Sequence, residues 1–405
     1  MDVSNSQAAL CTEDEFDTLP RASHLKSRIE AAVLVAKANA EAVDGDGRFP
    51  TEAFAELQAQ RLLGLLLPSE SGGEAASVSD AAQVCYALGR ACSSTALIFA
   101  MHQASVACLV RHADLNPKFA GYLKRIGDGQ LLVASSTTEG QNGANLRSSA
   151  SPIIWEDDHI SLSRDASVVS YGSQADAVIS TARKSNNSVP TDQVLVLFFK
   201  DQYHLSRTTG WNGLGMRGTC SDGFMLEAAG EREQVLTETY ERIHRRTMLP
   251  VSHLLWSASW AGIAAGAVER AQLFIRKAMR ASKGNLPPGA PCATQAYQSL
   301  MTLTKLIDSA LADFARRDET ALDDMSFQTS LNLLKVSVSE LSISTVLNAF
   351  YACGIAGYRN DSEFSIGRAL RDILSSSVMI NNNRILANVG PSVLIGGVPE
   401  QLSQN

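Results

Sequence analysis

Four side chains in the C-terminal half could carry chemistry from one face of a helix. His253, Trp256, Ser257 and Trp260 are spaced at i, i+3, i+4 and i+7. Residues at these intervals lie above one another on an α-helix. A histidine beside two indoles can exchange a proton near neutral pH. We therefore expect His253 to act as acid or base while Trp256 and Trp260 line a substrate pocket. The alternative is a core histidine that follows a helix start at 250–252.

His102 is the second candidate for proton transfer. It lies within the apolar run Phe99–Gln103, inside a predicted long and mostly buried helix over 93–112. A catalytic role for His102 and a purely structural role in the core are both open at this point.

A glycine-rich turn over Trp211–Ser221 can carry side chains to a site. Three glycines fall within eight residues, and glycine permits a positive φ at low steric cost. Met216 and Arg217 stand between these glycines. We expect Arg217 to bind substrate, and the alternative is an arginine on a surface turn.

A second unusual run, Ser135–Ala144, lies about 80 residues upstream and is rich in hydroxyl and amide side chains. The β-rich segments predict short strands over 130–135, 150–155, 159–169, 177–182 and 193–199. Helical periodicity dominates on either side, and after the strands it predicts helices over 249–279, 294–317, 325–354 and 368–388. The sequence predicts a tail at 1–22, an N-terminal helical domain over 23–128, a β domain over 129–232, a helical bundle over 233–395 and a tail at 396–405.

Composition excludes several classes of protein. The 405 residues are 45% apolar and 19% charged with a net charge of −7, which is ordinary for a globular protein and unlike a nucleic-acid surface. No apolar stretch reaches ~18 residues, and the acidic, polar 1–20 segment is unlike a secretory signal. The cysteines and histidines show no metal-ligand spacing and no disulfide framework. We expect a cytoplasmic protein without bound metal, membrane or nucleic acid.

The two runs, in their order and spacing, resemble the acyl-CoA dehydrogenase superfamily of flavoproteins. There a "TEP-x-x-GS" turn and a "GMRGT-x-S" turn frame the flavin and the acyl thioester. The resemblance covers roughly residues 25 to 395. It implies an α+β multidomain fold with an N-terminal helical domain, a middle β-sandwich or barrel and a C-terminal four-helix bundle.

The resemblance also implies a flavin site, with FAD as the expected cofactor. FMN, or reduced FAD from a partner reductase, are the alternatives. The residues that match the positions around the flavin ring are Ser135, Thr137, Thr138, Val168 and Ser170.

Two further matches concern the ADP portion of the cofactor. Gly354 falls in a stretch similar to the family's "GG-x-GY" loop, and Arg280 stands where the family clamps the pyrophosphate across a subunit interface. The family's Phe and Gln near Arg280 are absent, although its positive charge suits a pyrophosphate. The resemblance implies a homodimer or homotetramer.

The largest departure is the missing base. The glutamate that removes the α-proton follows an "RD" pair by about nine residues. Here that pair is Arg371–Asp372, and the position falls on Ile380. No carboxylate lies between Asp372 and Glu400, and the family's alternative position near Trp256 carries none either. A carboxylate suits this task because burial can tune its pKa.

Asparagines occupy the glutamate's neighbourhood instead. Asn382 is our catalytic candidate and Asn381 our substrate-binding candidate, since amides near a flavin can hydrogen-bond a thioester carbonyl. The alternative is a turn at a helix start.

We expect a flavin-dependent oxidoreductase that oxidises or oxygenates an acyl-CoA or similar thioester without the usual glutamate. Three alternatives stay open. The first is an acyl-CoA dehydrogenase with a different base, and the second a two-component monooxygenase supplied with FADH2 that acts on a non-CoA aromatic or ring substrate. The third is a scaffold without activity. The expected partner is a flavin reductase or an electron-transfer flavoprotein.

Overall fold

The computed structural model describes residues 21–113, 117–139, 148–396 and 398. The residues 140–144 of the second predicted run, most of both predicted tails and the whole 1–20 segment therefore lie outside the described residues.

The described chain opens with helices. A single residue separates the third helix, α3, from the fourth, α4. Helix α3 begins with a capping box, in which the side chains of Ser77 and Asp80 each accept a hydrogen bond from the other residue's backbone N–H. Most side chains of α4 are buried, as expected of a central helix. The bounds are α1 (Arg21–Asp46), α2 (Thr51–Ala59), α3 (Val78–Ala91), α4 (Ser93–His112) and α5 (Pro117–Gly129).

Two sheets follow. One has the order β1-β4-β5 with β1 and β4 parallel, and the other is antiparallel with the order β2-β3-β7-β6. All side chains of β5 are buried, whereas those of β3 mostly alternate between buried and less buried. The bounds are β1 (Val133–Ser136), β2 (Ile154–Glu156), β3 (His159–Val169), β4 (Ala177–Arg183), β5 (Gln193–Phe199), β6 (Tyr203–Thr209) and β7 (Asp222–Glu231).

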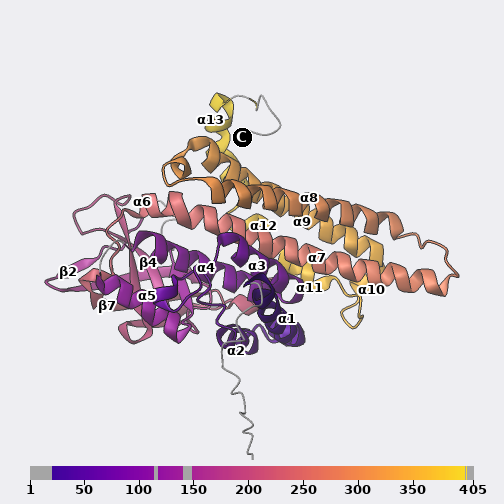
Figure 1. Ribbon diagram of the computed structural model, residues 1–405, viewed down its shortest axis with the longest axis horizontal. Helices are drawn as coiled ribbons and strands as arrows, with labels where there is room; N and C mark the ends of the chain where they lie inside the picture. The colour runs from indigo at the N-terminus through magenta and orange to yellow at the C-terminus, as the bar shows by residue number, and fades with distance from the viewer. Residues whose placement is uncertain (1–20, 114–116, 140–147, 397, 399–405) are drawn as a thin grey trace, which may run out of the picture.

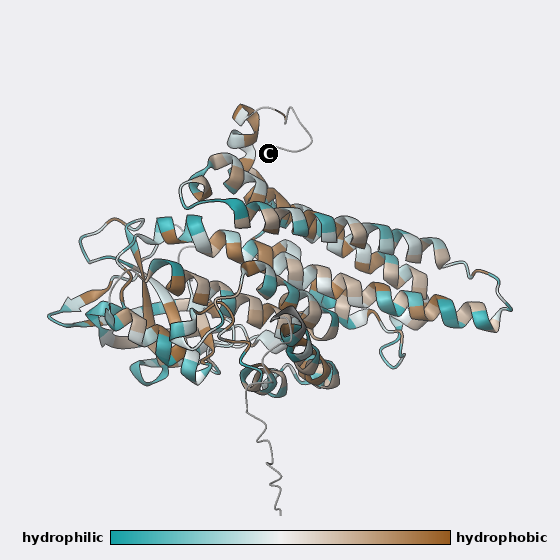
Figure 2. Ribbon diagram, in the orientation of Figure 1, coloured by the Kyte–Doolittle hydropathy of each residue, from teal (hydrophilic) through white to brown (hydrophobic). Residues whose placement is uncertain are grey.

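The C-terminal part is helical again. Its long helices α7, α8 and α9 run side by side toward one end of the molecule, with the strands at the opposite end (Figure 1). Apolar and hydrophilic turns alternate along these helices (Figure 2). The bounds are α6 (Tyr240–Ile243), the π-helical η6 (His244–Met248), α7 (Leu249–Ala281), α8 (Ala290–Arg316), α9 (Met325–Cys353), α10 (Ile355–Tyr358), α11 (Gly367–Ile373), α12 (Ser375–Val378) and α13 (Asn382–Gly396).

Glycines allow α3 and α7 to pack closely. A Cβ on Gly89 would collide with the carbonyl oxygen of Ser259, and one on Gly262 would collide with that of Tyr86. This contact joins the N-terminal helices to the long helix α7, which also packs against α8 and α9.

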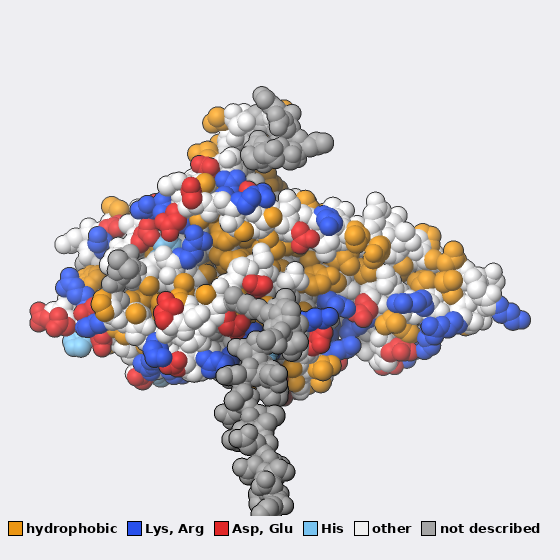
Figure 3. Space-filling view, in the orientation of Figure 1, with side chains coloured by type: hydrophobic (Ala, Val, Ile, Leu, Met, Phe, Trp, Pro, Cys, Tyr) orange, Lys and Arg blue, Asp and Glu red, His pale blue; other side chains and the backbone are white. Residues whose placement is uncertain are grey.

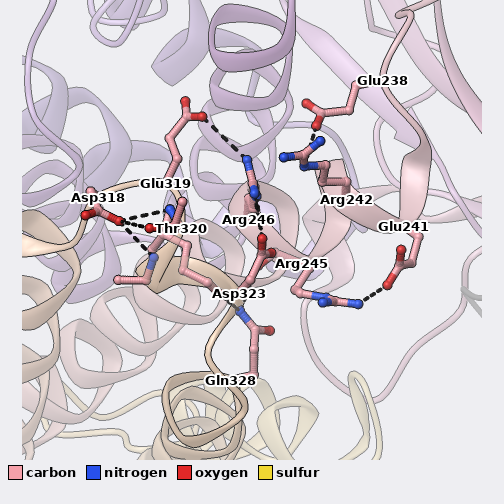
Figure 4. Close-up of polar contacts among 12 residues, drawn as sticks. Glu238, Glu241, Arg242, Arg245, Arg246, Asp318, Glu319, Thr320, Asp323 and Gln328 are labelled. Atoms are coloured by element: carbon pink, nitrogen blue, oxygen red, sulfur yellow. Dashed lines mark hydrogen bonds and ion pairs between the residues drawn. The ribbon is translucent and has the colours of Figure 1, made fainter.

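Ion pairs fix the start of α7 (Figure 4). Arg246, in η6, donates to Asp323 at 2.6 and 3.0 Å and lies 3.5 Å from Glu319. Both acids belong to the connection between α8 and α9. In η6 itself, Thr247 contacts the ring of His112 at 2.8 Å. The π-helical turn is therefore held from two sides.

The predicted fold class is confirmed, with differences in detail. The helix expected over 368–388 is interrupted, because α11 and α12 end at Ile373 and Val378 and α13 begins only at Asn382. Helices α4 and α9 are long and apolar enough to cross a membrane by composition, and 89% of the relevant window of α4 and 44% of that of α9 are buried inside the fold. Two such helices are weak evidence for a membrane span, since the buried core helix of a globular protein has the same length and composition.

Candidate functional site

The ends of β1 and β3 bring four of the predicted flavin-contacting positions together. The hydroxyl of Thr138 donates to the carbonyl oxygen of Val168 at 3.5 Å, and Ser167 reaches the Thr138 hydroxyl at 3.4 Å. Val168 lies in a β-bulge and is 43% exposed. Thr137 adjoins Thr138 and is half-buried. The exposed Val168 side chain therefore lies at the strand ends beside the hydroxyls of Thr138 and Ser167.

The glycine-rich turn joins the same site through a chain of hydroxyls. Thr219 and Ser221 lie 2.8 Å apart, and Ser221 lies 2.8 Å from the hydroxyl of Ser170. Thr219 also donates to the carbonyl oxygen of Met216 at 2.8 Å. Ser170, which follows β3, is thus bonded directly to the turn.

The turn is anchored on α11. The backbone N–H of Met216, which has a positive φ of 51°, donates to the carboxylate of Asp372 at 2.7 Å. Burial raises the pKa of Asp372, although the hydrogen bonds from Met216 and Ser93 oppose that rise. A Cβ on Gly215 would collide with the carbonyl of Arg371. Glycine is therefore required where the turn meets α11.

Arg217 points to the end of α1. Its guanidinium donates to the carbonyl oxygens of Asp44 at 2.6 Å and Gly45 at 3.3 Å. Arg371 pairs with the carboxylate of Asp44 at the same place. In this arrangement Arg217 satisfies carbonyls at a helix C-terminus, and its expected contact with substrate stays a prediction.

A buried ion pair fixes the residue after Thr138. The carboxylate of Glu139 lies 3.0 Å from Arg164, and both side chains are almost fully buried. Glu139 also accepts from the Ser149 hydroxyl at 2.7 Å and the Ala150 N–H at 2.6 Å. Burial would raise the pKa of Glu139, but Arg164 and these donors hold it below its usual value. Arg164 lies on β3 and also bonds the backbone of Thr181 on β4, so it ties the two sheets together.

A lysine that the sequence analysis missed organises the segment where the glutamate is absent. Lys335, on α9, is fully buried. Its ammonium donates to the carbonyl oxygens of Ser376 at 2.9 Å and Ile380 at 2.7 Å, and to the side-chain oxygen of Asn382 at 2.7 Å. Three acceptors use all three N–H groups, so no donor is left for another group.

The same lysine connects the two clusters that were predicted separately. Its ammonium lies 5.6 Å from the ring centroid of Trp260, within the range of a cation–π contact. Trp256 contacts both Trp260 and His253 through their rings. The structure therefore brings His253, both indoles and Asn382 together around Lys335. Burial lowers the pKa of Lys335 to about 8.

The seam between α7 and α9 contains buried polar atoms without partners in the described part of the chain. They are the indole N–H groups of Trp256 and Trp260 and the hydroxyls of Ser257 and Ser342. An indole N–H can only donate. Unsatisfied buried donors call for an acceptor, such as water or a ligand oxygen.

His253 is buried, and its Nδ1 lies 3.3 Å from the carbonyl oxygen of Leu331. Burial lowers its pKa to about 3. The side chain is therefore neutral across the range in which we expected it to titrate, so the structure favours the core interpretation of this residue.

His102 is likewise a buried structural residue here. Its Nδ1 accepts the N–H of Val133 at 3.0 Å, so Nε2 carries the proton and donates to the carbonyl oxygen of Leu63 at 2.8 Å. Burial lowers its pKa to about 4. Both ring nitrogens are occupied in linking α4 to β1 and to the residues before α3.

The remaining predicted site residues lie apart from these clusters. Asn381 is exposed and caps α13 by accepting the N–H of Asn383 at 2.9 Å, which fits the alternative of a helix-start turn. Ser135 is half-buried within β1. Arg280 and Gly354 are exposed at the ends of α7 and α9, far from the strands (Figure 1), and their expected contacts with the cofactor stay predictions.

Comparison with known proteins agrees with this architecture. Residues 29–129 match the family described as acyl-CoA dehydrogenase, N-terminal domain. The chain is 24% identical over 341 residues to a probable acyl-CoA dehydrogenase, YngJ of Bacillus subtilis, covering 82% of this chain and 87% of that one. It is also 24% identical over 366 residues to cyclohex-1-ene-1-carbonyl-CoA dehydrogenase of Geobacter metallireducens, covering 87% and 92%.

Among solved structures, FMN-bound TdsC of Paenibacillus sp. A11-2 superimposes with a TM-score of 0.79 at 17% identity, covering 93% of this chain and 98% of that one. TdsC is described as a dibenzothiophene monooxygenase. Helices, two sheets and a further set of long helices thus define an acyl-CoA dehydrogenase fold. Over its N-terminal helices and in its overall fold, the chain is similar to members of the acyl-CoA dehydrogenase superfamily.

Proposed function

We propose that the protein is a flavin-dependent oxidoreductase that binds FAD, or alternatively FMN, at the ends of β1 and β3. The observation that carries this proposal is the convergence of Thr138, Val168, Ser170 and Ser221. Hydroxyls there can bond the polar edge of a flavin, and Val168 offers an apolar surface to its ring. When bound, the flavin would accept or deliver electrons to a substrate or to O₂.

The segment after α11 determines which reaction we favour. At the position of the family's glutamate the backbone of Ile380 has a positive φ of 50° and its carbonyl bonds Lys335. Lys335 is a cation, and the indole N–H groups beside it are donors. The unpartnered indole N–H groups suit negative charge on a substrate oxygen, whereas neither the indoles nor the Lys335 ammonium takes a proton from carbon.

We therefore favour oxygenation of an acyl-CoA or similarly tethered substrate over ordinary α,β-dehydrogenation. The likeness to TdsC supports oxygenation, and the likeness to the dehydrogenases supports a thioester substrate. A dehydrogenase that uses another base, and a two-component monooxygenase acting on a free ring compound, are the alternative functions. A cytoplasmic homodimer or homotetramer supplied by a flavin reductase, or coupled to an electron-transfer flavoprotein, completes the proposal.

The test is spectroscopic. Purified protein is titrated with FAD and FMN, oxidised and reduced, and binding is followed by absorbance and fluorescence quenching. The proposal fails if neither flavin binds in either redox state.

The reaction is tested on the flavin-loaded protein. Straight-chain acyl-CoAs added anaerobically should reduce the flavin slowly, because loss of a general base costs about 10²–10⁴-fold. Reduced flavin supplied with O₂ and a panel of thioesters should yield oxygenated product. Complete bleaching within milliseconds by a saturated acyl-CoA would instead establish a dehydrogenase.

A further inference from the structure

Three arginines from three helices line one cavity away from the strand ends. Arg90 lies at the end of α3, Arg270 in α7 and Arg368 in α11, around a cavity of about 20 Å³. Ser93, in the first turn of α4, also lines it. No carboxylate is among the lining residues in the described part of the chain. Guanidiniums that face one space favour a negatively charged occupant.

The hydrogen bonds of these arginines leave donors unused. Arg368 donates from one terminal nitrogen to the carbonyl oxygen of Ala91 at 3.2 Å. Its other terminal nitrogen is buried and has no partner within the described residues. Arg270 donates to the carbonyl oxygen of Ser365 at 2.9 Å. Burial and the charge of Arg368 both lower the pKa of Arg270.

The nearby acids pair with two of the three arginines, and both acids are exposed. Glu269 pairs with Arg90 at 3.1 Å and is 52% exposed, and Glu41 lies 3.6 Å from Arg368 and is 78% exposed. The buried carboxylate of Asp372 accepts the N–H of Met216 and also interacts with Ser93 and Arg368. Among the ion pairs of the described chain, none within 4 Å involves Arg270.

We propose that this cavity binds an oxyanion, meaning a phosphate, sulfate or carboxylate group. A volume of about 20 Å³ admits roughly one water-sized group, so one oxygen enters while the rest of the anion lies at the mouth. The entering oxygen accepts from the unpartnered nitrogen of Arg368 and from Arg270, in charge-assisted hydrogen bonds. This site shares no residue with the proposed flavin site.

Titration calorimetry with inorganic phosphate tests the proposal on the full-length protein. Wild-type protein should bind phosphate saturably, and Arg270→Met should weaken binding by about 10-fold or more, since a charge-assisted bond is lost. Arg276→Met is the matched control, because Arg276 is exposed on the same helix and bonds only its own helix at Gln272. This control should bind phosphate as wild type does.

A competition experiment distinguishes the possible sources of the anion, and a second variant replaces Arg270→Met if that variant does not fold. Coenzyme A that competes with phosphate identifies the occupant as a phosphate group of a larger ligand, and coenzyme A that does not compete identifies a free ion. If Arg270→Met does not fold, Arg368→Lys is measured in its place. Lysine keeps the positive charge but lacks the planar guanidinium with its two terminal nitrogens, so this variant should also bind phosphate more weakly. Absence of saturable binding to wild type, or equal affinity in the folded arginine variants, would overturn the proposal.

Discussion

Lys335 illustrates how one buried cation can shape a turn. Burying an ammonium is costly unless its donors are satisfied, and here three oxygens within 2.9 Å satisfy them. Two of the acceptors are backbone carbonyls, one at Ser376 within α12 and one at Ile380 between α12 and α13. The lysine therefore substitutes for regular helical hydrogen bonds where the chain leaves helical geometry.

Replacing this lysine should loosen the segment. Lys335→Met keeps similar volume but leaves buried acceptors without donors, so we expect a loss of about 2–4 kcal/mol in the free energy of unfolding. Urea unfolding measures this loss, and hydrogen exchange should show faster exchange over 376–382. Lys305→Met, an exposed lysine on α8, is the control and should change stability by less than about 0.5 kcal/mol. Equal stability of the two variants would contradict the structural role.

The buried histidines predict how stability responds to acid. The pKa values of His102 and His253 are lowered to about 4 and about 3 from 6.5. Below pH 6.5 the unfolded chain therefore binds protons that the folded chain does not, so stability falls as the pH drops, by up to about 1.4 kcal/mol per pH unit for each histidine. His102→Gln and His253→Gln should each lower stability at pH 7 yet flatten its decline between pH 6.5 and 4. Unfolding curves at several pH values check this, and an unchanged slope would show that the ring is accessible to protons.

At the scale of elements, the positions of helices and strands were predicted well where apolar residues recur with a strong helical or strand period. The helix expected over 93–112 coincides with α4, and the strand expected over 193–199 coincides with β5. β7 was missed because glycines and acids at its ends weaken a strand signal. The break between α11 and α13 was missed because no glycine or proline falls within 368–388, although its serines and asparagines are weak helix formers.

The candidate site was predictable only where residue type carried the signal. The hydroxyl-rich strand ends and the glycine-rich turn were singled out by residue type, and the structure joins them through the bonds among Ser170, Ser221 and Thr219. Lys335 was not found, since lysine is almost always exposed and its acceptors come from a segment more than 40 residues away. His253 was assigned a titrating role because periodicity gives the face of a helix but not the depth of its burial.

The ion pairs around η6 should stabilise the junction that starts α7 (Figure 4). Arg246 is 9% exposed, and its removal leaves Asp323 partly buried without its partner. Arg246→Met should therefore cost about 1–3 kcal/mol in thermal or urea unfolding. Its neighbour Arg245 pairs with Glu241 within the same turn and is 42% exposed. Arg245→Met should cost less than about 0.5 kcal/mol, and comparable losses from both variants would argue against the bridging role.

At the scale of the whole molecule, hydrophobic side chains gather along the long helices (Figure 3). Tyr351, Ile355 and Tyr358, around the end of α9 and in α10, are 58%, 74% and 70% exposed. Tyr297 and Met301 on α8 are 48% and 44% exposed. Exposed apolar clusters of this kind are typical of interfaces. They agree with the expected homodimer or homotetramer.

Light scattering should therefore give a mass of two or four chains. Placing a charge in the interface, as in Ile355→Asp, should shift the population toward smaller species, because an unpaired buried charge is unfavourable. Val189→Asp, at a 64% exposed position near the strands, is the control and should leave the mass unchanged. A wild-type monomer would refute the interface.

The clamp of Arg371 on Asp44 has a consequence for biosynthesis. The two residues are 327 positions apart, and ribosomes add about 5–20 residues per second. The end of α1 therefore waits roughly 16 to 65 seconds before its partner has been translated. During that interval the nascent N-terminal helices lack the ion pair between Asp44 and Arg371. A chaperone that shields α1 would act after the synthesis of Asp44 and before that of Arg371.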